Sequence, residues 1–430
     1  MLTAAAGSID ITPESSCELA GYSIPRRYKD ISDPLEMNAL ILKDEGESVL
    51  FMTADLLYVT SEIKEEVWLK SGIYKIIDKD AFLFGASHTH FAPAVDREKP
   101  GLGKASEEYI NLVIDRSVEL LKQLFESQPE PVTLTYSEGK CDHSVNRRRM
   151  DWIVTREKLP RIKKTAQMAP NFKGKKDETL RALTIKKNDG TLLAVVWNYA
   201  CHPTAFPQIH SVSADFPGVC RNVLRKAMVG SCKPLPVLFY QGFSGDIRPR
   251  SILSKYPKNI AGIKHAIKAF INGPYFKLFL LEEYMEWSNS LAGVLVRTVA
   301  AHGETVRAES IECVSASILL SEILDGYAAE KFLTIRHIQL SSNFHFVAIS
   351  AEVVVEYVDI VKAIWGTSTV IPVGCIDTTY GYLPTIELVS EGGYECKGFM
   401  KLFGITSCFN SQLENTLMSR LRYLRKSSMR

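Results

Sequence analysis

The sequence predicts an α/β (α+β) fold in which mixed β-sheets are flanked by helices. Short apolar runs typical of strands recur along the 430 residues, and they alternate with segments whose apolar residues have helical spacing. The composition, 46% hydrophobic and 23% charged, is ordinary for a globular protein. No obvious linker, internal repeat or low-complexity tract interrupts the chain, so we expect one domain spanning residues 1–430.

The first part of the chain is predicted to begin with strands. Residues 38–42 and 49–55 flank a turn-like segment and should form a hairpin. A helix near 61–71 and a strand at 81–87 follow. A second helix is expected over 106–127, because apolar residues recur there at helical spacing: Ile110, Val113, Ile114, Val118 and Leu121.

The later part of the chain continues with the same two kinds of element. Strands are predicted at 180–185, 192–197, 237–239, 315–322, 334–340 and 344–351. Helices are predicted at 218–229, 276–301, 353–364 and 410–424. This interleaving of short strands with helices favours sheets whose faces are covered by helices.

One segment, residues 147–176, departs from these patterns. It is rich in lysine and arginine, contains only two acidic residues, and is interrupted by Pro160, Pro170 and Gly174 with little periodicity. We expect a long, mobile surface excursion. It is either a solvated basic loop, or a lid or surface that meets an anionic substrate.

Charge and hydropathy exclude several classes of protein. A net charge of +2 favours neither a nucleic-acid nor a strongly anionic partner, so no nucleic-acid partner is expected. No run approaches eighteen apolar residues, so no membrane span is expected. The N-terminus resembles a first strand more than a secretory leader, and nine cysteines without a Cys-x-x-Cys pair suit a reducing compartment. These features predict a cytoplasmic protein and leave its oligomeric state open.

Histidines at the ends of two apolar runs are the main functional signal. His88 and His90 follow the run at 81–84, and side chains two residues apart on a strand project to the same face. His202 ends the second run, after Trp197. Imidazole binds metals and carries protons at neutral pH. Two such sites in a chain with nine histidines suggest a metal-dependent hydrolase.

Three weaker signals accompany the histidines. Glu352 lies where an apolar strand turns into a helix, and is either a metal ligand or an acid that stabilises the first turn of that helix. The turn at 242–249 could aim Asp246 and Arg248 into a cleft, although most such turns have no catalytic role. Tyrosines beside glycines at 380–382 and 392–394 are more often packing residues than catalytic ones.

Taken together and in order, these short pieces resemble the neutral/alkaline ceramidase family, zinc amidases that cleave the N-acyl bond of ceramide. The similarity is to the catalytic domain and to the short bacterial members. It covers nearly the whole chain and is carried by Asp10–Pro13, Gly21–Tyr22, Thr53–Asp55, Ser87–His90, Asn146–Arg147, Asn198–Thr204, Gly245–Asp246 with Pro249, Ala351–Glu352, Tyr382 and Tyr394.

The resemblance implies a role for each matched residue. It implies that zinc is bound by His88, His202, Glu352 and Tyr382. It places His90 beside the metal as a second active-site histidine. It further implies catalytic or substrate-contacting roles for Arg147, Asp246 and Tyr394. Asn146 and Tyr380 are candidate substrate-binding residues.

Two departures from the family pattern bear on the substrate. Arg248 stands where the ceramidases have a serine essential to amide cleavage, and a guanidinium has only N–H donors and a permanent charge. It would suit a carboxylate, a phosphate or a developing oxyanion. The sequence also shows neither a C-terminal immunoglobulin-like domain nor a leader, so we do not expect ceramide itself to be the substrate.

These observations predict a zinc-dependent hydrolase that cleaves an N-acyl amide with a metal-activated water. His90 would transfer the proton, and Arg248 or Arg147 would stabilise the oxyanion or an anionic part of a small-molecule N-acyl substrate. The alternatives are an N-deacetylase of a nucleotide-linked amino sugar, an esterase on the same metal site, or a catalytically inactive zinc-binding relative.

Overall fold

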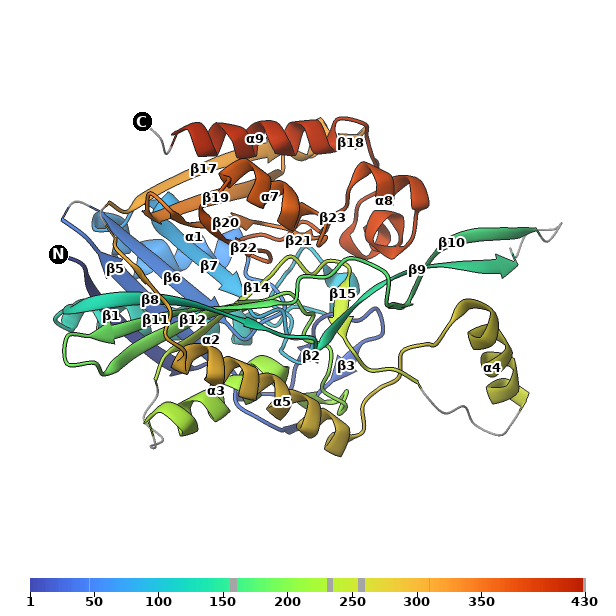
Figure 1. Ribbon diagram of the computed structural model, residues 1–430, viewed down its shortest axis with the longest axis horizontal. Helices are drawn as coiled ribbons and strands as arrows, with labels where there is room; N and C mark the ends of the chain where they lie inside the picture. The colour runs from blue at the N-terminus through green and yellow to red at the C-terminus, as the bar shows by residue number, and fades with distance from the viewer. Residues whose placement is uncertain (46, 155–160, 230–234, 254–259, 309, 428–430) are drawn as a thin grey trace.

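Two β-sheets pack face to face between two layers of helices (Figure 1). The structure is a computed structural model, which describes residues 1–430 except 46, 155–160, 230–234, 254–259, 309 and 428–430. Side chains from both sheets fill the space between them, among them Leu40, Phe51, Ile338 and Phe346. The mixed α/β architecture predicted from the sequence is therefore confirmed.

Among the described residues, the larger sheet has nine strands. Its order is β14 (Val237–Gln241), β12 (Leu192–Tyr199), β11 (Thr179–Lys187), β8 (Glu130–Lys140), β1 (Thr3–Asp10), β5 (Glu36–Lys43), β6 (Ser48–Ala54) and β7 (Phe82–Ala86), with β16 (Glu304–Val306) on β8. The predicted hairpin is β5–β6, with Leu42 opposite Val49. The pairs β6–β7 and β12–β14 are parallel, and both β7 and β12 lead into candidate site residues.

Four helices cover the outer face of this sheet: α1 (Ser61–Lys70), α2 (Glu107–Glu126), α3 (Asp215–Val229) and α5 (Leu281–Ala300). The alternation of β5 explains how one strand serves two layers. Ala39 and Ile41 face α1 and α2, whereas Leu40 and Leu42 face the second sheet. Such a strand is apolar on both faces, as expected of a buried sheet.

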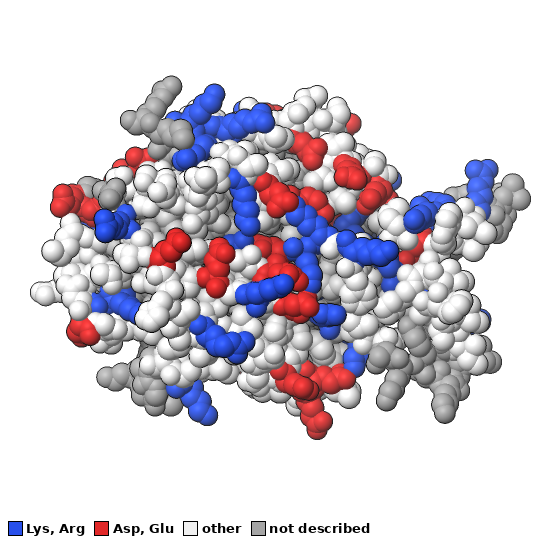
Figure 2. Space-filling model, viewed as in Figure 1, with Lys and Arg blue, Asp and Glu red and all other residues white. Residues whose placement is uncertain are grey.

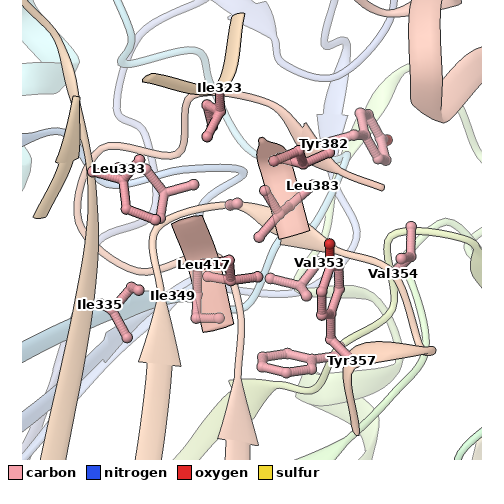
Figure 3. Close-up of a cluster of buried hydrophobic side chains, with 14 of the residues drawn as sticks. Ile323, Leu333, Ile335, Ile349, Val353, Val354, Tyr357, Tyr382, Leu383 and Leu417 are labelled. Atoms are coloured by element: carbon pink, nitrogen blue, oxygen red, sulfur yellow. The ribbon is translucent and has the colours of Figure 1, made fainter. Parts of the chain in front are cut away.

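The second sheet consists of β17 (Glu312–Leu319), β19 (Phe332–Ser341), β20 (Phe344–Ile349) and β22 (Thr369–Val373). Helices α7 (Tyr357–Trp365) and α9 (Leu413–Ser427) cover its outer face. Beyond β20, the short strands β21 (Glu352–Val353) and β23 (Tyr382–Leu383) pair in parallel. Figure 3 shows Val353 and Leu383 within the apolar cluster that holds these two strands in place.

Most of the basic segment at 147–176 is regular, which corrects the expectation of an irregular excursion. Strands β9 (Ser144–Val154) and β10 (Ile162–Asn171) form an antiparallel pair, and β15 (Ile247–Pro249) adds to β9. In Figure 1 this pair extends beyond the sheets, alongside α4 (Ile260–Asn272). Charge misled the prediction because Arg147 and Arg148 are buried and paired with Glu395. Residues 155–160 lie outside the described part.

Several predicted boundaries were also wrong. The helix expected from 353 begins at Tyr357, because Glu352 and Val353 form β21. The strand expected over 315–322 ends at Leu319 and is followed by α6 (Leu320–Ile323). The helix α4 and the strand β8 were not predicted. The remaining elements are short: β2 (Glu18–Leu19), β3 (Arg26–Arg27), β4 (Asp30–Ile31), β13 (Ser211–Val212), β18 (Leu324–Asp325), β24 (Cys408–Phe409) and α8 (Ile386–Glu391).

The surface and the thiols are unremarkable. Over the face shown in Figure 2, lysine and arginine are interspersed with aspartate and glutamate, so neither charge forms a continuous field there. Where the structure describes the chain, each cysteine is a free thiol. None of the helices in those same ranges combines the length and the apolar character needed to cross a bilayer.

Candidate metal centre and active site

Three histidines meet where strands of the larger sheet end. His88 and His90 follow β7, and His202 follows β12. The first and last strands of this sheet, β14 and β7, are in contact, because the hydroxyl of Tyr240 in β14 donates to the carbonyl of Leu83 in β7. Ligand atoms of the three histidines lie within 4.8 Å of one another, so this group could hold a metal ion.

The backbone fixes the tautomers of two of these imidazoles. Nδ1 of His88 is 3.0 Å from the carbonyl of Leu57, and Nδ1 of His202 is 2.7 Å from the carbonyl of Ser244. Each Nδ1–H therefore donates to a carbonyl, and each Nε2 faces Glu352. Metal-binding histidines are commonly oriented in this way.

Glu352 joins the histidines from the second sheet. Its Oε2 lies 3.0 Å from Nε2 of His202 and 3.4 Å from Nε2 of His88. Its Oε1 accepts a hydrogen bond of 2.5 Å from the hydroxyl of Tyr58. Burial alone would raise the pKa of Glu352, but the two histidines lower it well below its usual value. The site thus contains an ionised carboxylate facing two imidazole nitrogens.

Tyr382 completes the group predicted to bind zinc. It lies directly opposite Glu352 in the β21–β23 pair and is buried. Burial, and then the charge of Glu352, raise the pKa of its phenol well above the usual value. The structure therefore brings His88, His202, Glu352 and Tyr382 together from four separate parts of the chain.

Unpartnered buried nitrogens test whether this group suits a metal ion. Nε2 of His88 and both ring nitrogens of His90 are buried and have no hydrogen-bond partner among the described residues. Unpaired buried polar atoms are costly, and a bound cation would satisfy Nε2 of His88. Imidazole nitrogen, carboxylate and phenol oxygen are suitable ligands for zinc. The residues present therefore fit a divalent metal.

His90 lies at the edge of this group. Its ring centroid is 5.2 Å from that of His88 and 5.3 Å from that of Tyr22. Burial, and then the neighbouring His88, hold the pKa of His90 well below its usual value. A neutral imidazole beside the candidate ligands has a lone pair that can accept a proton.

Gly21 sets the position of the His90 ring, and its replacement should be harmful. Gly21 has a φ of 98°, and a Cβ there would overlap the His90 imidazole. We expect Gly21→Ala to lower amide turnover roughly 10²-fold by displacing His90, while bound metal is kept. Steady-state kinetics with metal analysis tests this. Gly72→Ala is the matched control, since Gly72 has a φ of 76° and open space around it. Equal kinetics for the two variants would contradict the role given to Gly21.

Arg147, Asn146 and Asp246 lie beside the site but are engaged by other groups. Nε of Arg147 donates to Glu395 at 2.8 Å, and its guanidinium lies 5.4 Å from the ring centroid of Tyr382. Asn146 donates to Asp246 at 2.6 Å. Asp246 also accepts a hydrogen bond from the backbone N–H of Val355, just after β21, and burial raises the pKa of Asp246. Asn146 and Asp246 thus join β9 to the turn before β15 rather than facing the histidines.

The other sequence-predicted residues separate into two places. Tyr394 packs edge-on against Tyr382, with ring centroids 5.4 Å apart, and so borders the site. Arg248 borders it on another side, where burial, and then the positive charge of Arg147, lower its pKa. Tyr380 lies apart from the histidines, with its ring 5.7 Å from Nζ of Lys331.

Sequence reasoning missed two residues of this site. Tyr58, which holds Glu352, lies just beyond the Thr53–Asp55 stretch that carries part of the resemblance. A tyrosine soon after a strand end was the available signal. Glu395 holds both Arg147 and Arg148, and no local pattern points to it, because its partners are 248 and 247 residues away.

Comparisons with known proteins support the fold. The sequence matches no protein-family model and no curated protein. Among solved structures, a neutral ceramidase from Pseudomonas aeruginosa superimposes with a TM-score of 0.74 and 14% identity, over 99% of this chain and 75% of that one. A structure described as ceramidase complexed with C2 gives a TM-score of 0.73 and 15% identity over the same shares. The chain therefore has a ceramidase-like fold, as the sequence resemblance predicted.

Proposed function

We propose that this protein is a metal-dependent hydrolase that cleaves an N-acyl amide bond. The observation that carries the proposal is the convergence of His88, His202 and Glu352, with Tyr382 opposite the carboxylate. These four residues would hold the metal, and their nitrogen and oxygen donors favour zinc. The proteins with similar structures are named as ceramidases, which supports an amide rather than an ester as the bond cleaved.

The chain's own residues supply orientation and proton transfer. A bound divalent ion would polarise the amide carbonyl and lower the pKa of water toward neutrality. His90, held neutral by burial, would accept the proton of the attacking water and return it to the leaving amine. Tyr58 orients Glu352, and the backbone carbonyls of Leu57 and Ser244 orient the two histidines. These contacts hold the reacting groups in place before substrate binds.

Arg248 argues for a substrate other than ceramide. It stands at the position where the resemblance has a serine, and it cannot act as a hydroxyl nucleophile. The same site could deacetylate an N-acetylated amino sugar linked to a nucleotide, which is also an N-acyl amide and carries phosphates. That reaction is the second candidate, favoured by the guanidinium at 248.

Metal removal tests the proposal directly. Protein treated with 1,10-phenanthroline and dialysed should lose at least about 10²-fold in amide hydrolysis and regain it with Zn²⁺, since the metal activates the water. The assay follows free amine from a panel of N-acyl amines and N-acetylated sugar nucleotides, and acid from matched esters. Full activity without metal would contradict metal dependence. Faster cleavage of the esters would favour an esterase, and no turnover by zinc-loaded protein would favour a non-catalytic relative.

A further inference from the structure

Arg248 has no anionic partner within the part of the chain that the structure describes. Its Nη1 is 3.8 Å from the sulfur of Met168, and its guanidinium carbon lies 4.7 Å from the ring centroid of Phe276. Its Nε is buried and has no hydrogen-bond partner. The guanidinium is thus held by weak contacts that leave its charge uncompensated.

The neighbouring Arg147 and Arg148, unlike Arg248, each have an anionic partner. Arg147 donates to one oxygen of Glu395 at 2.8 Å, and Arg148 donates to the other at 2.7 Å. Both oxygens of this carboxylate are therefore occupied. Burial, and then the like charge of Arg147, lower the pKa of Arg248. A cation kept in a largely buried position beside another cation is costly, unless an anion joins it at some stage.

The position of Arg248 ties it to the candidate active site. It lies opposite Val145 in the β15–β9 pair, so it shares a face of that pair with Arg147, two residues further along. The residue just before it, Ile247, accepts a 3.0 Å hydrogen bond from Nδ1 of His202. The backbone that presents Arg248 therefore also orients a proposed metal ligand.

A groove lies next to the two residues that contact the Arg248 guanidinium. Met168 and Phe276, which contact Arg248, also line a groove of about 840 Å³ between the β9–β10 pair and α4. Small-molecule sites are commonly of this size and combine apolar walls with a few polar groups. Arg248 therefore contacts two walls of a groove that is large enough for a small molecule.

We propose that Arg248 binds a carboxylate or phosphate of the substrate, so that the enzyme acts on anionic N-acyl amides. The inference rests on the proposed function and names its substrate class. A guanidinium offers parallel N–H donors that match both anions, and its charge does not depend on pH in the working range. Loss of this charge should weaken binding of anionic substrates selectively.

The test compares charged and neutral amides in binding and in hydrolysis. The probes are N-hexanoylglycine, N-hexanoylphosphoethanolamine and neutral N-hexanoylethanolamine, with N-propylsuccinamic acid and N-propylbutanamide as a pair charged on the acyl side. Calorimetry on metal-free protein measures binding without turnover, and amine release from zinc-loaded protein measures hydrolysis. The variants are Arg248→Met, which keeps length without charge, and Arg250→Met as the matched control, because Arg250 is exposed and paired with Asp142.

We expect at least one anionic probe to bind about 10- to 100-fold more tightly than its neutral partner, as a charge-assisted hydrogen bond would give. Arg248→Met should abolish that preference and Arg250→Met should keep it. The carboxylate and phosphate probes show which anion is preferred. Equal binding of charged and neutral probes by the unaltered protein overturns the inference, as does a loss of turnover in Arg248→Met that is equal for both. Preferential binding without hydrolysis of any probe keeps the anion site and overturns the amidase function.

Discussion

Replacing His202 with alanine is expected to remove both the bound metal and the hydrolytic activity while the protein stays folded. Nε2 of His202 is the closest nitrogen to Glu352, at 3.0 Å, and its tautomer is fixed by two backbone carbonyls. Removing a residue that merely orients a ligand typically costs about 10- to 100-fold in metal affinity or activity. Loss of the ligand itself should cost more, so elemental analysis should find less than about a tenth of the zinc bound by the unaltered protein.

The control is His302→Ala, which removes an exposed histidine and should keep full zinc and full turnover. Circular dichroism confirms that each variant is folded. His88→Ala should repeat the result, because its Nε2 faces the same carboxylate at 3.4 Å. If either variant at 88 or 202 retains stoichiometric zinc, the ligand assignment is wrong.

Three of the four proposed metal ligands could be found from sequence because each lies where an apolar strand ends, whereas Tyr382 was assigned only through the family resemblance. His88 and His202 end two such runs, and they meet because β14, the neighbour of β12, contacts β7 through the hydroxyl of Tyr240. Glu352 could be found for the same reason, but the secondary structure around it was predicted wrongly. The pattern around it suggested a helix start, whereas pairing with Tyr382 makes a strand there. That pairing depends on a segment thirty residues away, which no local pattern reveals.

Pairing of charges over long sequence distances explains the largest error of the fold prediction. Residues 147–154 were expected in an irregular surface segment because they are rich in arginine. The burial of Arg147 and Arg148 in β9 depends on Glu395, which supplies one carboxylate oxygen to Arg147 and the other to Arg148. When the partner of a charged residue is unknown, the best prediction is that the residue is exposed. The alternation of apolar and polar residues within one strand could not identify Glu395 as that partner.

A second buried ion cluster joins α1, β19 and the segment that follows β22, near the site. Asp377 accepts from Lys64 of α1 at 2.7 Å and from Arg336 of β19 at 2.6 Å. Its segment also links the strands that lead to the ligands. The N–H of Ala86 donates to the carbonyl of Cys375, and the N–H of Cys375 donates to the carbonyl of Ala351. One stretch of chain therefore bridges the residues that precede His88 and Glu352.

Asp377→Asn should lower the free energy of unfolding by about 3–5 kcal/mol, because it removes the carboxylate paired with the buried Lys64 and leaves Arg336 paired only with the more exposed Asp80. Urea unfolding measures the difference. Asp325→Asn is the control and should stay within about 0.5 kcal/mol, since Asp325 is exposed.

The pH dependence of that difference separates a lost charge pair from a simple packing defect. Burial alone would raise the pKa of Asp377, but Lys64 and Arg336 outweigh burial and hold it below the ordinary value of 3.8. The folded state therefore favours the ionised carboxylate. Its contribution to stability is fully present above pH 3.8 and is lost as the pH falls through the lower, folded pKa. The gap between the unaltered protein and Asp377→Asn should shrink in acid below that value, whereas a packing defect would leave the gap unchanged there.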